Sequence, residues 1–192
     1  VNSGAGHARK RGIRAALGVI VVFLDADSTY DSSDIPRLLD WTTNYDQVNG
    51  ARDTDQGNLV WLRVSVKFIL RMLASLFACQ YIPDLNTGLK ALNRKVLLKY
   101  IDLIPNGFSC VTTMTLSFMV TGHKVKYVPT KYKPRIVKSK FHPIKDTFNL
   151  IRAIFRTVWK LRPERMIFFL LMVSYIVFAI CTKSSINKAI HS

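Results

Sequence analysis

Two aspartates separated by a single residue, Asp25 and Asp27, are the side chains of this sequence best suited to chemistry. They directly follow an apolar run at residues 19–24. Because side chains at i and i+2 of an extended chain point the same way, both carboxylates should converge on one point. Mg²⁺ is typically held by one or two carboxylates together with phosphate oxygens. The pair predicts a divalent metal site, with an acidic turn that caps the next helix as the alternative.

The elements around this pair predict an α/β fold. Residues 19–24 (VIVVFL) are apolar and mostly β-branched, which predicts a strand buried on both faces of a parallel sheet. Residues 2–17 predict a preceding helix that Asn2 or Ser3 caps and Gly18 ends. In open α/β sheets, ligands bind at the carboxyl ends of strands, which is where the acidic pair lies.

The chain continues with alternating helices and strands. Residues 32–44 (SSDIPRLLDWTTN) predict a helix that Ser32 or Ser33 caps. Patterning also predicts strands at 47–51 and 125–128 with a candidate extension at 132–135, a loop at 83–88 before a short element at 89–92, and helices at about 59–79, 111–121 and 143–161.

The charge is strongly asymmetric. The chain carries 28 Lys and Arg against 12 Asp and Glu, a net charge of +16, and residues 123–165 alone contribute +11. Such a bias predicts a polyanionic partner, either nucleic acid or an anionic membrane. Because no groove-reading or base-stacking motif is recognisable, the membrane is favoured over nucleic acid. Three widely spaced cysteines form neither a disulfide framework nor a zinc motif.

An uncharged segment at residues 166–181 follows the basic stretch. As a helix it spans about 24 Å, somewhat less than the ~30 Å hydrocarbon core. Arg165 and Lys183 flank it and can extend to the two interfaces. We predict a transmembrane helix at 165–183, with the basic stretch on the cytoplasmic side. A buried core helix is the alternative.

The helix expected at 143–161 has one apolar and one basic face, as helices that lie on membranes do. Packing of its apolar face on the domain core is the alternative. The predicted organisation is an α/β domain at 1–141, a basic juxtamembrane amphipathic helix at 142–164, a transmembrane helix at 165–183 and a tail at 184–192.

Several motifs occur in an order that resembles the inverting glycosyltransferases of family two, in particular the dolichyl- or polyprenyl-phosphate mannose and glucose synthases. They are Asn2-x-Gly4, Ala8-Arg9, Gly12-Ile13, Asp25-Ala26-Asp27, residues 48–52 (VNGAR), 84–89 (DLNTGL), 105–109 (PNGFS), 125–129 (VKYVP) and 132–141. The resemblance implies a GT-A-type nucleotide-sugar-binding fold. The first β-α-β unit of that fold is expected before Val1, so this chain would hold only part of the donor site.

The family's reaction moves a hexose from a nucleotide-sugar donor to a polyprenyl phosphate with inversion. By resemblance, Asp25, Asp27 and Thr29 would hold Mg²⁺ or Mn²⁺, and Asp27 would thereby serve catalysis. Thr29 stands where many relatives have Gln. A metal ion there would stabilise the charge that gathers on the leaving diphosphate.

The acceptor is an anion, so cations must offset the repulsion between the two phosphates. Arg135, Ser139 and Lys140 resemble the residues that hold the lipid phosphate, and Arg52 is a second candidate because guanidinium groups suit phosphate oxygens. Asp84 resembles a family aspartate that is a candidate general base. Because a phosphate monoester is largely dianionic at neutral pH, orienting an arginine or sugar hydroxyls suits Asp84 better. A plain turn residue is the alternative.

The sequence leaves other functions open. One is a catalytically inactive remnant that only binds membranes, because Thr29 and Val137 depart from the family pattern. The net charge also leaves a nucleic-acid binder as a third, less favoured function. A homo-oligomer is compatible with the sequence.

Overall fold

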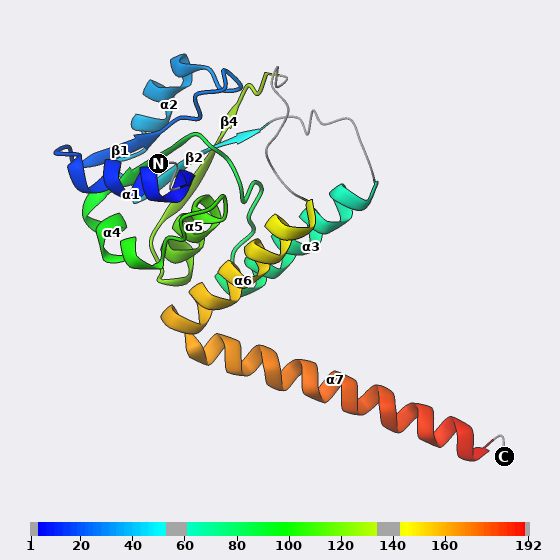
Figure 1. Ribbon diagram of the computed structural model, residues 1–192. Coiled ribbons are helices and arrows are strands. Elements are labelled where there is room, and N and C mark those ends of the chain that lie inside the picture. Colours follow the sequence, from blue (N-terminus) through cyan, green and yellow to red (C-terminus); the bar gives the residue numbers. More distant parts are fainter. Residues whose placement is uncertain (1–3, 53–60, 134–142, 191–192) are drawn as a thin grey trace.

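A four-stranded mixed sheet forms the centre of the computed structural model, which describes residues 4–52, 61–133 and 143–190. The strands are β1 (Ile20–Phe23), β2 (Gln47–Arg52), β3 (Lys90–Asn93) and β4 (Val125–Thr130), in the spatial order β1-β3-β2-β4. β3 runs antiparallel to both of its neighbours, whereas β2 and β4 pair in parallel (Figure 1).

The first strand differs from its prediction. β1 is antiparallel to β3 at one end of the order, and only Val21 of its four residues is buried. The expectation of a strand buried on both faces of a parallel sheet is therefore wrong for the described fold. A β-branched run specifies an extended conformation, but the direction of the neighbouring strand depends on distant residues.

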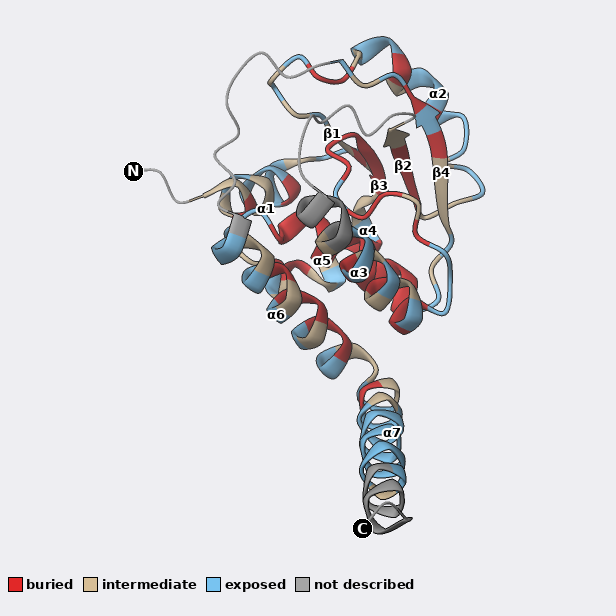
Figure 2. Cartoon of the chain, turned by 90° about the vertical axis from the view of Figure 1, so that its right-hand side faces the viewer, coloured by how far each residue is buried: buried red, intermediate tan, exposed pale blue. Residues whose placement is uncertain are grey.

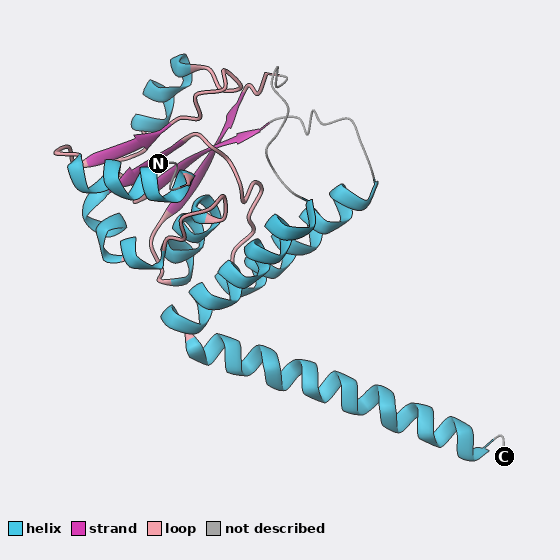
Figure 3. Ribbon diagram, in the orientation of Figure 1, coloured by secondary structure: helices cyan, strands magenta, loops and turns pink. Residues whose placement is uncertain are grey.

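Seven helices lie in the described ranges (Figure 3). They are α1 (Ala5–Ala15), α2 (Ile35–Leu39), α3 (Trp61–Ala78), α4 (Arg94–Lys99), α5 (Cys110–Val120), α6 (Pro143–Leu161) and α7 (Pro163–Ile190). Side chains alternate between the faces of β3, so Leu92 packs with α1, α4 and α5, while Ala91 packs with Leu38 of α2. The sheet therefore lies between α2 on one face and α1, α4 and α5 on the other.

The helix expected at 32–44 is shorter than predicted. Ser32–Asp34 form a 3-10 turn, and α2 covers only Ile35–Leu39. The cap is Asp31, whose carboxylate accepts a hydrogen bond of 3.0 Å from the backbone N–H of Ser33. Asp31 lies one residue before the expected serine and offers a charged acceptor, which explains why it takes the role.

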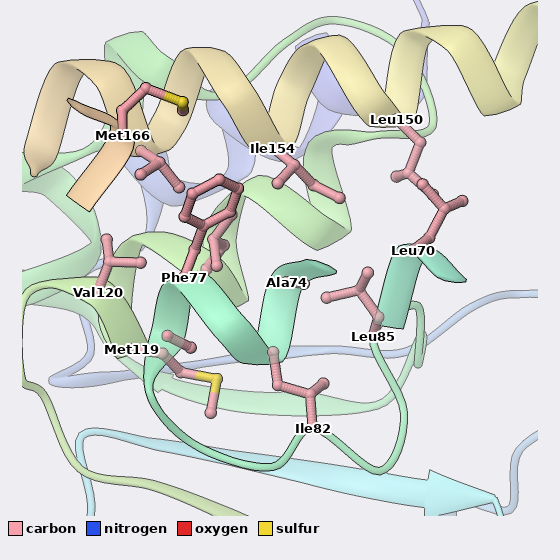
Figure 4. Packing of buried hydrophobic residues seen from close by; sticks show 13 residues of the cluster. Leu70, Ala74, Phe77, Ile82, Leu85, Met119, Val120, Leu150, Ile154 and Met166 are labelled. Atoms are coloured by element: carbon pink, nitrogen blue, oxygen red, sulfur yellow. The ribbon is translucent and has the colours of Figure 1, made fainter. Parts of the chain in front are cut away.

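A second core joins α3, α5, α6 and the start of α7 (Figure 4). The rings of Phe77, Phe155 and Phe169 meet edge to face, with centroids 5.2–6.1 Å apart. Such aromatic pairs contribute about 0.5–1.5 kcal/mol each beyond their buried area. The cluster attaches three helices to each other and to the domain.

The face of α6 that was predicted to lie on a membrane is divided between two environments. Leu150, Ile154 and Val158 are buried against α3 and α5, so the core-packing alternative holds for them. Ile144 and Phe148, which belong to the same predicted apolar face, are exposed. The sequence shows one broad apolar stripe, but only part of it fits against the neighbouring helices.

α7 extends away from the domain and is exposed along most of its length (Figure 2). Its segment Pro163–Lys183 has a mean hydropathy of 2.2 and is long and apolar enough to cross a membrane. Only 6% of that apolar window is buried, so α7 is not a core helix. At its base, Arg162 donates to the carbonyl of Val120 (3.0 Å) and Arg165 to that of Phe77 (2.5 Å).

Candidate functional site

Three segments that are distant in sequence are connected by hydrogen bonds near the end of β2. The Tyr30 hydroxyl accepts a hydrogen bond of 2.9 Å from the backbone N–H of Gly88 and lies 3.2 Å from the hydroxyl of Thr87. Thr87 in turn donates to the carbonyl oxygen of Gly50 in β2. The loop after β1, the loop at 84–88 and β2 therefore form one connected site.

Asp25 lies between α1 and the loop at 84–88. Its Oδ1 forms an ion pair of 2.8 Å with Arg9 of α1, and its Oδ2 faces the backbone of Gly88. Arg9 also donates a hydrogen bond of 3.0 Å to the thiol of Cys110, which begins α5. Two elements thus fix the orientation of this carboxylate, whose side chain is 34% exposed.

Asp27 has different partners. Its Oδ1 accepts hydrogen bonds from the Thr29 hydroxyl (2.6 Å) and the Thr29 backbone N–H (3.3 Å). Between them, Ser28 adopts a left-handed conformation with φ 60° and turns the chain sharply. The hydroxyl of the buried Thr29 therefore orients Asp27 in this structure.

Arg52 and Asp84 form a bidentate ion pair with N–O distances of 2.7 and 2.8 Å. Burial by itself would raise the pKa of Asp84, but the hydrogen bonds and charge of Arg52 lower it below its usual value. The same contacts outweigh the effect of burial on Arg52 and raise its pKa. Asp84 is therefore an ionised partner that orients a guanidinium group.

The predicted acceptor residues Arg135, Ser139 and Lys140 lie outside the described residues. The chain approaches them through Tyr132 and Lys133. The Lys133 backbone N–H donates to the Thr29 carbonyl (2.8 Å), and the ring of Tyr132 lies 5.2 Å from the guanidinium carbon of Arg52. Tyr132 and Lys133, the last described residues before that gap, thus lie beside Arg52 and Thr29.

The donor set of the site fits a hard divalent cation. Asp25 and Asp27 offer carboxylate oxygens on one short loop, and Mg²⁺ needs only one or two such groups when phosphates complete its coordination. Within the described residues no cluster of three or more His, Cys, Asp or Glu side chains could hold a metal ion by itself. A cation held by these two carboxylates would take its remaining ligands from phosphate oxygens or water.

Sequence reasoning gave no role to Arg9, Tyr30 or Lys90. Tyr30 connects two loops of the site, and burial raises the pKa of its hydroxyl. Lys90 is buried in β3, where it donates a hydrogen bond to Thr115. The one available signal was a lysine inside the apolar stretch at residues 89–92 (LKAL), an unusual place for a charge.

Comparison with known proteins shows the family of this chain. The model of glycosyl transferase family 2 matches residues 1–101. The chain belongs to glycosyl transferase family 2. Among curated family members, the glycosyltransferase AglJ of Haloferax volcanii is 32% identical over 161 residues, which cover 80% of this chain and 52% of that protein.

Solved structures show the same fold. Glucosyl-3-phosphoglycerate synthase from Mycobacterium tuberculosis, in complex with phosphoglyceric acid, superposes with a TM-score of 0.59 at 17% identity, over 82% of this chain and 56% of that one. The same enzyme with Mn²⁺, uridine diphosphate and phosphoglyceric acid gives 0.58 at 16%, over 82% and 53%. The predicted α/β, GT-A-like fold is confirmed, and the chain spans about half the length of these relatives.

Proposed function

We propose that this family 2 chain forms part of a membrane-associated glycosyltransferase that moves a hexose from a nucleotide-sugar donor to a polyprenyl phosphate with inversion. The observation that carries the proposal is the connected site in which Asp25, Asp27 and the Arg52–Asp84 pair lie on hydrogen-bonded segments. Family membership supplies the reaction class, and the acceptor is inferred from the charge and the apolar helix.

The negative charge on the diphosphate of the nucleotide-sugar donor must be neutralised during transfer. Asp25 and Asp27 would hold Mg²⁺ or Mn²⁺, which would stabilise the departing diphosphate. Arg9 fixes one oxygen of Asp25, and Thr29 holds one oxygen of Asp27. These contacts orient both carboxylates before substrate arrives, so that little reorganisation is needed during the reaction.

The acceptor end needs a fixed cation for a phosphate. Asp84 holds Arg52 through two hydrogen bonds, and Tyr132 packs over its guanidinium group. This leaves Asp84 to position Arg52 rather than to remove a proton, since an ionised phosphate is already a nucleophile. Arg135, Ser139 and Lys140 would complete the contacts to the lipid phosphate.

Association with a membrane is supported by α7 and by the outer face of α3 and α6. We define this outer face by its exposed apolar residues, which are Phe68, Ile69, Met72, Leu76, Ile144, Phe148 and Trp159. Exposed Lys145, Arg152, Arg156 and Lys160 lie beside it on α6. α3 and α6 lie side by side (Figure 2), so an anionic bilayer that receives α7 would also contact this face. The basic stretch would then lie on the cytoplasmic side.

Sugar transfer into lipid by membranes that contain the full-length protein tests the proposal. We expect incorporation of labelled hexose from a nucleotide sugar into a polyprenyl phosphate, its loss with a chelator, and its recovery with Mg²⁺ or Mn²⁺. Asp27→Ala should abolish transfer, and Asp102→Ala, on the exposed side of the domain, should not. Equal rates for wild type and Asp27→Ala would contradict the metal role.

The same experiment separates the enzyme from an inactive, membrane-binding remnant. A remnant would associate with anionic vesicles in a salt-sensitive manner, yet it would neither bind uridine diphosphate in the presence of Mn²⁺ nor transfer sugar. Salt-sensitive RNA binding without detergent would instead favour the nucleic-acid function.

A further inference from the structure

Lys90 is a lysine whose side chain is fully buried inside the sheet. It begins β3 and pairs with Phe23 of β1 on one side and with Asn49 of β2 on the other. Its ammonium group donates a hydrogen bond to the hydroxyl of Thr115 on α5. Burying an ammonium group is unfavourable unless its surroundings compensate the charge, so the groups around Lys90 decide its role.

Four ionisable groups of the candidate site act electrostatically on Lys90. They are Asp84 in the loop after α3, Arg9 on α1, the Cys110 thiol at the start of α5, and Asp25 in the loop after β1. Arg9 already balances Asp25, and Arg52 already balances Asp84. In the part of the chain that the structure describes, Lys90 forms no ion pair within 4.0 Å. When protonated, Lys90 thus adds one positive charge to two ion pairs that are each neutral overall.

We propose that Lys90 is a positioning residue of the donor site, whose buried positive charge strengthens binding of the donor's diphosphate. The inference rests on the proposed function and deepens it, because it explains how a site with paired arginines still attracts a polyanion. Charges in a protein interior act over several ångströms with little screening by salt. Lys90 therefore acts on the diphosphate without touching it.

This role has a thermodynamic signature. Burial lowers the pKa of Lys90 to about 7, although the charge of Asp84 acts in the opposite direction. A bound diphosphate favours the charged ammonium and raises this pKa, so binding near neutral pH takes up protons. Free Lys90 loses its charge as the pH rises through 7, so affinity for the diphosphate falls in that range.

Calorimetric titration of the purified full-length protein with uridine diphosphate, at saturating Mn²⁺, tests the inference. Measurements in two buffers of different ionisation enthalpy give the number of protons taken up. Wild type should take up protons above neutral pH, and its affinity should fall with rising pH. Lys90→Met should bind roughly tenfold more weakly, with less proton uptake and a flatter pH profile. Lys90→Arg keeps the charge and should restore affinity without proton uptake, since an arginine stays protonated.

The outcomes separate this inference from the proposed function. Wild-type binding that is independent of pH around neutrality, or Lys90→Met binding with unchanged affinity and proton uptake, overturns the role of Lys90 and leaves the glycosyltransferase intact. Failure of wild type to bind uridine diphosphate with Mn²⁺ overturns both. Thermal melting shows whether Lys90→Met folds. If it does not fold, the pH dependence of wild-type affinity for uridine diphosphate still tests the role of Lys90.

Discussion

The backbone of Gly88 lies directly against the carboxylate of Asp25. A β-carbon at position 88 would lie 2.0 Å from Oδ2 and 2.4 Å from Cγ of Asp25. The N–H of Gly88 is bonded to the Tyr30 hydroxyl, and Arg9 holds the other oxygen of Asp25. A side chain at position 88 must therefore displace the aspartate that we assign to the metal.

Gly88→Ala should impair catalysis far more than stability. Asp25 can rotate away because its side chain is partly exposed, so the melting temperature should change little. Misplacing a metal ligand should reduce metal-dependent sugar transfer about 100-fold. Initial rates across a Mn²⁺ titration measure this. Gly107→Ala, where a β-carbon meets nothing within 4 Å, is the matched control. Full activity in Gly88→Ala would remove Asp25 from the metal site.

Breaking the Arg52–Asp84 pair should destabilise the domain. Asp84→Asn leaves Arg52 without its anionic partner and should lower the free energy of unfolding by about 3 kcal/mol. Arg52→Met combined with Asp84→Asn should cost less than the sum of the single changes, which denaturant titration can measure. Additive losses would show that the pair contributes no coupling energy.

The same pair predicts how stability depends on acid. Because the folded-state pKa of Asp84 is lowered, its stabilising contribution is complete above the ordinary aspartate pKa of about 4. The contribution is lost as the pH falls from there through the folded pKa. Melting temperatures of wild type should therefore decrease more steeply than those of Asp84→Asn over this acidic range. Equal dependence of the two melting temperatures on pH would contradict the lowered pKa of Asp84.

Two glycines of α1 provide a packing test. A β-carbon at Gly6 would lie 1.9 Å from the carbonyl oxygen of Pro105, whereas one at Gly12 meets nothing within 4 Å. Gly6→Ala should cost about 1–3 kcal/mol, because backbone must move. Gly12→Ala should add about 0.5–1 kcal/mol, because alanine favours the helix. Thermal or denaturant unfolding of both variants checks the contrast, and equal effects would contradict the close contact of α1 with residues 105–106.

The outer face of α3 and α6 should enter the lipid interface. Trp159 lies on this face and is 54% exposed, while Trp41, 40% exposed, lies just after α2, beyond the opposite face of the sheet. Single-tryptophan variants, in which Trp61 and one of these two residues are replaced, can be placed in vesicles with brominated lipids. We expect strong fluorescence quenching for Trp159 and little for Trp41. Equal quenching would contradict the assigned orientation.

The spacing of apolar residues predicted most helices and strands, because the buried side of each needs apolar residues at regular intervals. The helix at 143–161 coincides with α6, and the strands at 47–51 and 125–128 nearly match β2 and β4. The antiparallel position of β1 was missed, since strand direction depends on β3, some 70 residues later. The chemical type of the side chain was enough to select four candidate site residues from the sequence, which are Asp25, Asp27, Arg52 and Asp84. Their roles in the site remain predictions.

The contacts within the site could not be predicted in the same way. Arg9 meets Asp25, and Tyr30 meets Gly88, only because the loops fold together in three dimensions. The split of α6 into core-facing and exposed apolar positions likewise depends on how α3 and α5 pack against it. A sequence shows which residues are apolar, but which of them find a partner is decided by tertiary structure.

Arg162 and Arg165 join the corner before α7 to carbonyls in the last turns of α5 and α3. Helix ends leave such carbonyls without intrahelical partners, so both bonds satisfy groups that would otherwise need water. The two hydrogen bonds therefore fix the start of α7 to the ends of α5 and α3. In the membrane arrangement that we propose, the tilt of that single helix would set how high the candidate site stands above the bilayer and which side of the site the lipid headgroups can reach.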